Sequence, residues 1–451
     1  MWTKSRMLDG GIEMKESEAI YQAYVRILEE ELIPAMGCTE PIAVAYCGAV
    51  ARQALGALPD RVEVEASGNI IKNVKSVVVP NTGHRRGIPA AVAAGIVAGD
   101  PALQLEVISQ VTAAQQADIG AFLEKVPVEV RLAESPLIFD IVVTVHQGSS
   151  YARARIANFH TNVVLVEKDG EALIRKDVEN QAEGGLTDRG CLTVAGIVDF
   201  ADTVILSDVS PLLDTQIAYN MAIAEEGLKG DYGANVGTVL LASHPEVLSA
   251  QGPSAVRLRA RAMAAAGSDA RMNGCELPVV INSGSGNQGI TASVPVVVYA
   301  QALGASQEKL YRALVLSNLL AIHQKSTIGR LSAYCGAINA GAAAGCGIAY
   351  LEGGGLDAVS HTLVNALAIS SGVICDGAKA SCAGKIALAV DSGILGWEMY
   401  QQGQQFLAGD GIVKKGVENM IASVGRLGRE GMRETDKEIL HIMVDKWVSE
   451  E

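Results

Sequence analysis

The spacing of hydrophobic residues changes near residue 190, and this change predicts two regions with different secondary structure. Before it, helical spacing is mixed with the apolar–polar alternation of half-buried strands, while after it the strand pattern nearly disappears. Residues 177–189 are polar and contain glycine, as expected for a linker. We therefore predict an α+β chain, with a mixed domain over residues 14–180 that contains an antiparallel sheet, and a mostly α-helical domain over residues 190–451.

The first region begins with a helix over residues 16–32, which Pro34 and Gly37 end. A second, very apolar helix runs to about residue 54, with Thr39 predicted as its N-cap and Glu40 as a carboxylate in its first turn. Further helices are expected over residues 90–98 and 111–123, and strands over residues 61–67, 77–79, 128–131, 139–146, 151–157 and 163–167.

The second region is rich in alanine and glycine, and aromatic residues make up only 4% of the chain. Small residues favour helices that approach one another closely. Helices are expected over residues 192–200, 211–226, 255–266, 294–304, 308–323, 331–351, 356–371 and 385–400.

Composition limits the partners of the chain. A net charge of −14 and the lack of a Lys/Arg-rich run argue against nucleic acid, because phosphate binding requires clustered cations. Two long uncharged stretches, residues 277–307 and 331–351, are too polar or too weakly apolar to span a bilayer, so we expect no membrane association. A homo-oligomeric assembly stays open.

The first 13 residues lack the apolar run of a secretory signal, so we expect a cytoplasmic protein. In that reducing compartment the eight cysteines are expected to be thiols, metal ligands or nucleophiles and not disulfides.

Three cysteines form the first candidate site. Cys335, Cys375 and Cys382 follow the spacing C-x39-C-x6-C, and glycine next to Cys335 and close to Cys375 would let the backbone approach a bulky inorganic group. Thiolates are the usual ligands of iron–sulfur clusters, and three ligands would leave one of four irons open as a Lewis acid. The spacing alone favours a simpler interpretation, buried structural thiols, as we expect for Cys47, Cys191, Cys275 and Cys346.

Cys38 forms the second candidate site, because it directly precedes a predicted helix. A helix N-terminus stabilises anions and lowers the pKa of a thiol, so Cys38 is a candidate general base or a neighbour of the cluster. The Thr39 hydroxyl and the nearby N–H groups could hold a carboxylate. A buried cysteine at a tight turn is the commoner outcome for such a segment.

The third candidate is the glycine-rich segment 282–289, in which Ser283, Ser285, Asn287 and Gln288 alternate with small residues. Such a loop exposes N–H donors that suit a substrate carboxylate. It is similar to the substrate loop of fold-type II pyridoxal-phosphate enzymes, but the chain has no matching Schiff-base lysine segment. A plain connection between helices also stays open.

Other polar residues carry weaker signals. Lys325 could assist proton transfer if it were desolvated, although a solvated helix-end lysine is as common. Arg85 and Arg86 could pair with a carboxylate, but a surface loop is the commoner outcome. His160 lies among strands, where a structural histidine is the default.

Several motifs together resemble the L-cysteine desulfidase family, relatives of the iron–sulfur L-serine dehydratase alpha chain. They occur in order along most of the chain: Leu-Ile-Pro-Ala-Met-Gly-Cys-Thr-Glu-Pro at residues 32–41, Ser-Gly-Asn at 67–69, Gly-Ser-Gly-Asn-Gln-Gly at 284–289, and the motifs of Cys335 and of residues 375–382. Several motifs in the right order are more specific than any one of them.

The resemblance implies that Cys335, Cys375 and Cys382 bind a 4Fe-4S cluster and that Cys38 lies at the active site as a base. It also implies cleavage of L-cysteine to sulfide, ammonia and pyruvate, so a small amino acid is the expected substrate. The serine dehydratases have Ser-Ser-His-Thr where this chain has residues 36–39, which favours cysteine. The alternatives are an L-serine dehydratase and a non-catalytic iron–sulfur sensor.

Overall fold

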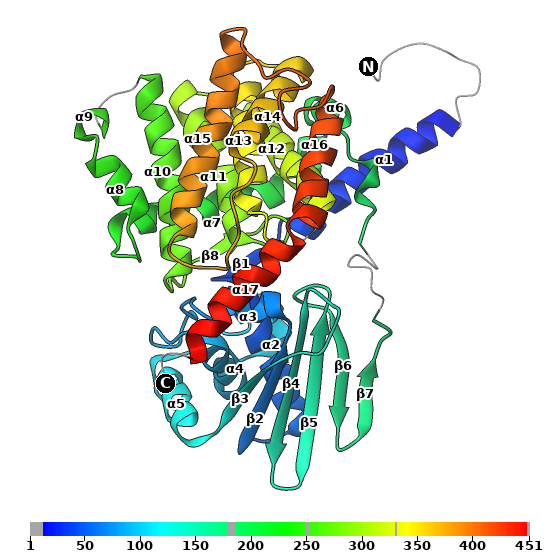
Figure 1. Cartoon of the computed structure of the whole chain (residues 1–451), viewed down its shortest axis with the longest axis vertical. Helices are drawn as coiled ribbons and strands as arrows, with labels where there is room; N and C mark the ends of the chain where they lie inside the picture. Colours follow the sequence, from blue (N-terminus) through cyan, green and yellow to red (C-terminus); the bar gives the residue numbers. More distant parts are fainter. Residues whose placement is uncertain (1–11, 179–185, 249–251, 330–331, 449–451) are drawn as a thin grey trace.

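The computed structural model describes residues 12–178, 186–248, 252–329 and 332–448. Figure 1 shows a sheet with its covering helices in one half of the molecule and a helical block in the other. This arrangement confirms the predicted α+β class. The six strands of the sheet lie in the order β3-β2-β4-β5-β6-β7, with bounds β2 Arg61–Ala66, β3 Val128–Leu132, β4 Asp140–Gln147, β5 Ser150–Ala157, β6 Val163–Lys168 and β7 Glu171–Arg175.

The sheet is antiparallel except at one edge, where β2 and β3 are parallel. Parallel neighbours need a long connection, and here α3 (Gly68–Val74), α4 (Gly87–Ala98) and α5 (Ala113–Lys125) supply it. The buried face of the sheet packs against α2 (Thr39–Leu55), which also packs against α4. Because α2 is covered on both sides, almost its whole length is apolar and buried.

Three local predictions in this half need correction. The predicted strand at residues 77–79 forms only an isolated bridge between Val78 and Arg86, because the turn at Pro80 stops the ladder. Strand β7 and helix α3 were not predicted; β7 is exposed along its whole length, so it carries no apolar alternation. The N-cap of α2 is Cys38, with φ −78° and ψ 130°, and Thr39 is its first helical residue.

The second half consists mainly of helices, as predicted. Their bounds are α6 Val194–Thr203, α7 Ser210–Lys229, α8 Val236–Ala242, α9 Pro245–Leu248, α10 Pro253–Met272, α11 Gly286–Leu303, α12 Gln307–Ile328, α13 Gly336–Leu351, α14 Leu356–Ser370, α15 Cys382–Gln401, α16 Val417–Arg426 and α17 Arg433–Val448. The close approach expected from small residues is present between α13 and α15, where a Cβ on Gly345 would lie 2.3 Å from the carbonyl oxygen of Gly393.

Both ends of the chain connect the two halves. Helix α1 (Ile12–Glu31) contacts α12, and β1 (Pro34–Met36) pairs with β8 (Pro278–Val280). Helix α17 runs from the helical half down to α3 (Figure 1). The predicted linker lies partly outside the described residues, and the domain boundary near residues 180–190 stays a prediction.

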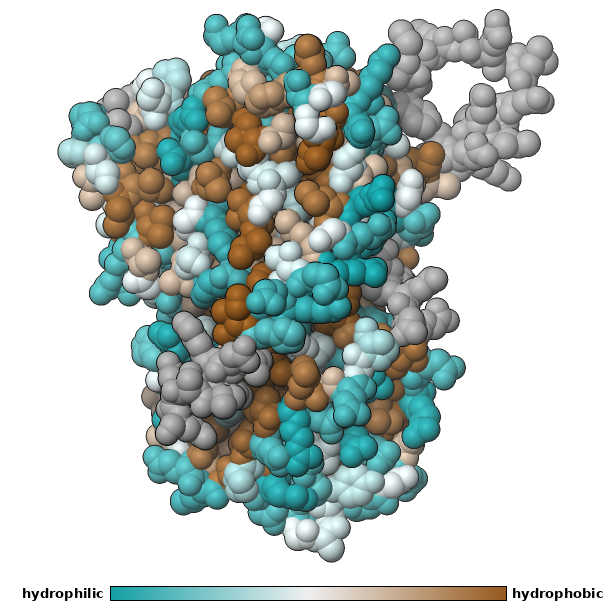
Figure 2. All heavy atoms as spheres, viewed as in Figure 1, coloured by the Kyte–Doolittle hydropathy of each residue, from teal (hydrophilic) through white to brown (hydrophobic). Residues whose placement is uncertain are grey.

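The high mean hydropathy of +0.24 reflects a large core, because valine, isoleucine, leucine and alanine dominate the buried residues. Figure 2 shows many hydrophilic side chains on one face of the molecule, with apolar patches between them. Over the described ranges, no helix combines the length and the apolar character that crossing a bilayer requires.

Candidate active site

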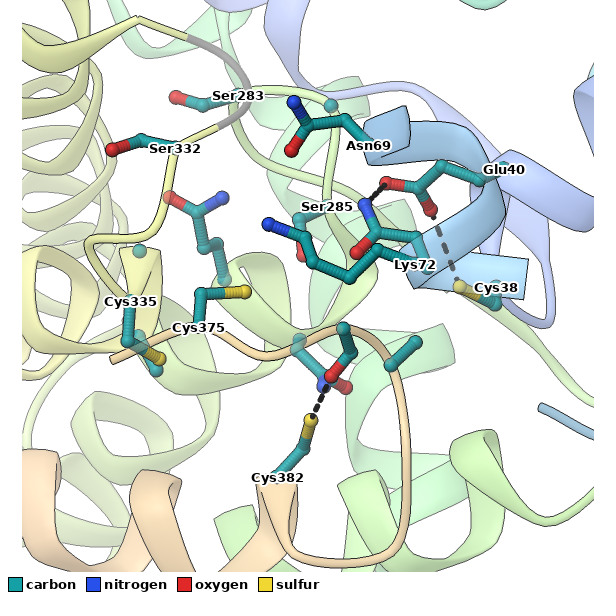
Figure 3. Close-up of a pocket in the computed structure, with 18 of the residues that line it drawn as sticks. Cys38, Glu40, Asn69, Lys72, Ser283, Ser285, Ser332, Cys335, Cys375 and Cys382 are labelled. Carbon is teal, nitrogen blue, oxygen red and sulfur yellow. Dashed lines mark hydrogen bonds between the residues drawn. The ribbon is translucent and has the colours of Figure 1, made fainter. Parts of the chain in front are cut away.

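A cavity of about 100 Å³, measured as the space open to the centre of a water molecule, is lined by residues of both halves. Its walls come from α2 and α3 of the first half and from α10 to α13, α15 and the segment before α15 of the second. Figure 3 shows the three predicted cluster cysteines on one side of this pocket and residues of α2 and α3 on the other. Apart from Thr39, all the predicted site residues line it: Cys38, Ser283, Ser285, Asn287, Gln288, Lys325, Cys335, Cys375 and Cys382.

The three cysteines meet because two distant segments are joined by backbone hydrogen bonds. The N–H of Cys335 donates to the carbonyl of Val373 at 3.0 Å, and the N–H of Cys375 donates to that of Ala333 at 2.6 Å. Cys335 is the N-cap of α13 and Cys382 is the first residue of α15, so both thiols stand at helix N-termini that face the pocket. Cys335 is buried, and the other two cysteines are half-buried.

These thiols suit an iron–sulfur cluster by their chemistry. Burial raises the pKa of Cys335 to about 12, with a further rise from Cys375, and burial also raises the pKa of Cys382. Metal binding would displace these protons and remove the cost of burying the sulfur atoms as thiolates. Among the described residues, no three His, Cys, Asp or Glu side chains are grouped closely enough to hold a single ion. Three soft thiols around one space instead suit a cluster, whose ligands bind different irons.

The glycines beside these cysteines allow close contacts with other parts of the pocket lining. A Cβ on Gly336 would lie 2.6 Å from the side-chain amide carbon of Gln288. Gly377 has φ +94°, and a Cβ there would lie 2.3 Å from the carbonyl oxygen of Lys72. Both glycines therefore allow the cysteine segments to pack tightly against the opposite wall of the pocket.

Cys38 faces the pocket from the N-terminus of α2 and is only 2% exposed, so it is buried like the core thiol Cys346. Its thiol donates to Oε2 of Glu40 at 3.2 Å. Burial raises the pKa of Cys38 well above its usual value, and the negative charge of Glu40 raises it further, while Arg271 opposes this. The predicted lowering of this pKa is therefore wrong, because burial and a neighbouring carboxylate outweigh the helix dipole.

Glu40 is a buried carboxylate that we had assigned only to a helix first turn. It accepts hydrogen bonds from Asn73 Nδ2 and Thr39 Oγ1, both at 3.1 Å, as well as from Cys38. Burial by itself would raise the pKa of Glu40, but His160, Cys38 and Arg271 together lower it. The site thus pairs an ionised carboxylate with a neutral thiol.

Thr39 does not line the pocket, and its hydroxyl instead joins two segments of the chain. Its hydroxyl lies 3.0 Å from the carbonyl oxygen of Gly284 and so connects α2 to the glycine-rich segment. That segment ends in α11, which begins at Gly286 and thus earlier than predicted. The first turn of a helix has N–H groups without intrahelical acceptors, so Asn287 and Gln288 lie where an anion is favoured.

Three further cations belong to the site. Lys325 lies in the last turn of α12 and is buried, as a role in proton transfer would require. Arg271 and Lys72 also line the pocket, but no sequence motif marked them: Arg271 is one of several charged residues of α10, and Lys72 lies in the short helix α3, which was not predicted. Arg85 and Arg86 do not line it.

The chain is similar to known proteins over most of its length. The family model described as serine dehydratase alpha chain matches residues 102–441. A UPF0597 protein of Desulfitobacterium hafniense is 57% identical over 96% of this chain and 99% of its own length. UPF0597 proteins of Lachnoclostridium phytofermentans and Treponema denticola are each 46% identical, over 94% and 96% of this chain and 100% of their own lengths.

Proposed function

This chain belongs to the serine dehydratase alpha chain family, and on that premise we propose that it is an iron–sulfur L-cysteine desulfidase. The reaction is an α,β-elimination: L-cysteine loses its Cα proton and its sulfur, and the remaining aminoacrylate hydrolyses to pyruvate and ammonia. Family membership supports an iron–sulfur lyase; the choice of L-cysteine is our proposal.

One observation carries the proposal: Cys38 lines the same pocket as Cys335, Cys375 and Cys382, although the first half of the chain supplies it. A small apolar cluster that contains Cys38, Val77 and Met272 also packs against Cys382. This arrangement supports a role for Cys38 as an acid–base group in the pocket that the three proposed ligands line. A sensor would not need this group.

In the proposed reaction, Cys38 takes the Cα proton after losing its own, and Lys325 is the alternative base. The first turn of α11 and the side chains of Ser283, Ser285, Asn287 and Gln288 would hold the substrate carboxylate. An iron–sulfur cluster on the three cysteines would supply a Lewis acid for the departing sulfur.

The test is an assay of anaerobically reconstituted protein, in which sulfide and pyruvate are measured with L-cysteine and, in parallel, with L-serine. We expect sulfide from L-cysteine in amounts equal to pyruvate. A fully loaded cluster without sulfide release would refute the proposal. Pyruvate from L-serine alone would instead support a serine dehydratase, the second candidate, which the family match itself favours.

The role of Cys38 is tested by Cys38→Ala, which should abolish turnover and leave most of the iron in place. Cys346→Ala is the matched control, because Cys346 is buried like Cys38 but lies outside the pocket. Loss of the cluster in Cys38→Ala would make Cys38 a ligand and not a base.

A further inference from the structure

Arg271 has the largest of the fully buried side chains in the described part of the chain. It lines the candidate site. It lies in the last turn of α10 and is 2% exposed. Removing a guanidinium from water is costly unless an anion compensates for it. A buried arginine in a pocket wall therefore needs a partner.

The described residues offer Arg271 very little. Its Nη1 donates to the neutral side-chain oxygen of Asn287 at 3.1 Å, and its Nε has no hydrogen-bond partner. Glu40 is close enough for Arg271 to lower its pKa, but the two residues form no ion pair in the described structure. The Glu40 carboxylate is instead occupied by Cys38, Thr39 and Asn73.

The start of α11 packs closely against this guanidinium. A Cβ on Gly286 would lie 2.3 Å from Nε of Arg271, so only glycine leaves the group where it is. Gly286 is the first residue of α11, whose N-terminal end favours anions. Arg271 and the first turn of α11 thus lie side by side in the pocket wall, joined by the hydrogen bond from Arg271 to Asn287.

We propose that Arg271 binds the α-carboxylate of the substrate, which would lie in the pocket beside both the guanidinium and the first turn of α11. This role rests on the proposed function for the substrate class, an α-amino acid, and holds equally for L-cysteine and L-serine. Guanidinium and carboxylate match in geometry as well as in charge, which lets one residue both orient and select the substrate.

The test compares ligands that differ only by the carboxylate. Binding of L-serine against ethanolamine, and of L-cysteine against cysteamine, is measured on anaerobically reconstituted protein. We expect the amino acids to bind roughly 10- to 150-fold more tightly than the amines, the range for hydrogen bonds to a charged group. Arg271→Gln should remove most of this ratio with its iron content unchanged, and Arg271→Lys should keep part of it.

Two more variants separate binding from folding. Gly286→Ala should lower the same ratio by displacing the guanidinium, even if Arg271→Gln folds poorly. Arg261→Gln, on the same helix but paired with Asp391 outside the pocket, should leave the ratio unchanged.

The outcomes are distinct. The role of Arg271 would be overturned if Arg271→Gln kept the wild-type ratio of affinities. It would also be overturned if this variant lost its iron while the ratio stayed unchanged. A wild-type protein that binds no amino acid better than its amine would overturn it too. If the ratio depends on Arg271 but L-cysteine yields no sulfide, the proposed function fails and the carboxylate site stands.

Discussion

The thiol of Cys38 donates a hydrogen bond to Oε2 of Glu40, with 3.2 Å between the two atoms. Both residues are buried, and their pKa values move in opposite directions, that of Cys38 upward and that of Glu40 downward. At neutral pH the pair is therefore a thiol and a carboxylate. A base acts only after it loses its proton, so this pair controls the pH at which Cys38 can work.

The first prediction concerns Glu40→Gln. In the wild type, kcat/KM for sulfide release should rise with pH until the pH exceeds the high pKa of Cys38. The Gln variant removes the negative charge that raises this pKa, so the rise should occur at lower pH. Asn73→Ala is the control, because it removes a hydrogen bond to Glu40 but keeps the charge. An unchanged pH profile in Glu40→Gln would exclude Cys38 as the base.

The second prediction concerns the proposed ligands. Replacement of Cys335, Cys375 or Cys382 by serine should each remove most of the iron, because a hydroxyl is a poor ligand for a soft cluster. Iron and acid-labile sulfide per chain measure this after anaerobic reconstitution. Cys191→Ser, outside the pocket, should keep the wild-type content. Full cluster occupancy in any one of the three variants would remove that residue from the ligand set.

The third prediction concerns the contact between α3 and α17. Nζ of Lys72 lies 2.5 Å from Oδ1 of Asp436, and Asn69 donates to the other carboxylate oxygen at 3.1 Å. Asp436→Asn leaves a buried cation unpaired and should destabilise the protein by about 1–3 kcal/mol. The double variant Lys72→Met/Asp436→Asn should recover part of this loss, since no charge is then left unpaired.

The unfolding temperatures of these variants measure the predicted loss and recovery of stability. Glu434→Gln, which breaks an exposed pair with Lys437 on the same helix, should change the unfolding temperature little. If Asp436→Asn is as stable as Glu434→Gln, the pair between Lys72 and Asp436 does not stabilise the contact.

The fourth prediction concerns the helix pair α13 and α15. Gly345→Ala would place a methyl group 2.3 Å from the carbonyl oxygen of Gly393, so the two helices must separate, at a cost of about 1–3 kcal/mol. Gly384→Ala in α15 meets nothing within 4 Å and should be neutral or slightly stabilising. Equal unfolding temperatures for the two variants would contradict the close packing.

Much of the local structure follows from the sequence. The helical spacing of residues 308–323 and the alternation of residues 61–67 reflect which side of each element is buried, and both elements are present as predicted. Misses occurred where that signal is weak: β7 is exposed on both faces, and α3 is a short helix among polar residues. The three predicted ligands needed several motifs together, because spacing alone favoured buried thiols.

What the sequence by itself determined is the class of fold and the kinds of groups at the candidate site: thiols, a glycine-rich segment and helix N-termini. The tertiary structure alone decided which of these groups meet. It placed Cys38 beside Glu40, reversed the expected direction of the Cys38 pKa, and brought Arg271 and Lys72 into the same pocket. The physical reason is that periodicity records whether a position is buried, whereas a pKa or an ion pair depends on neighbours that can be hundreds of residues away; 364 separate Lys72 from Asp436.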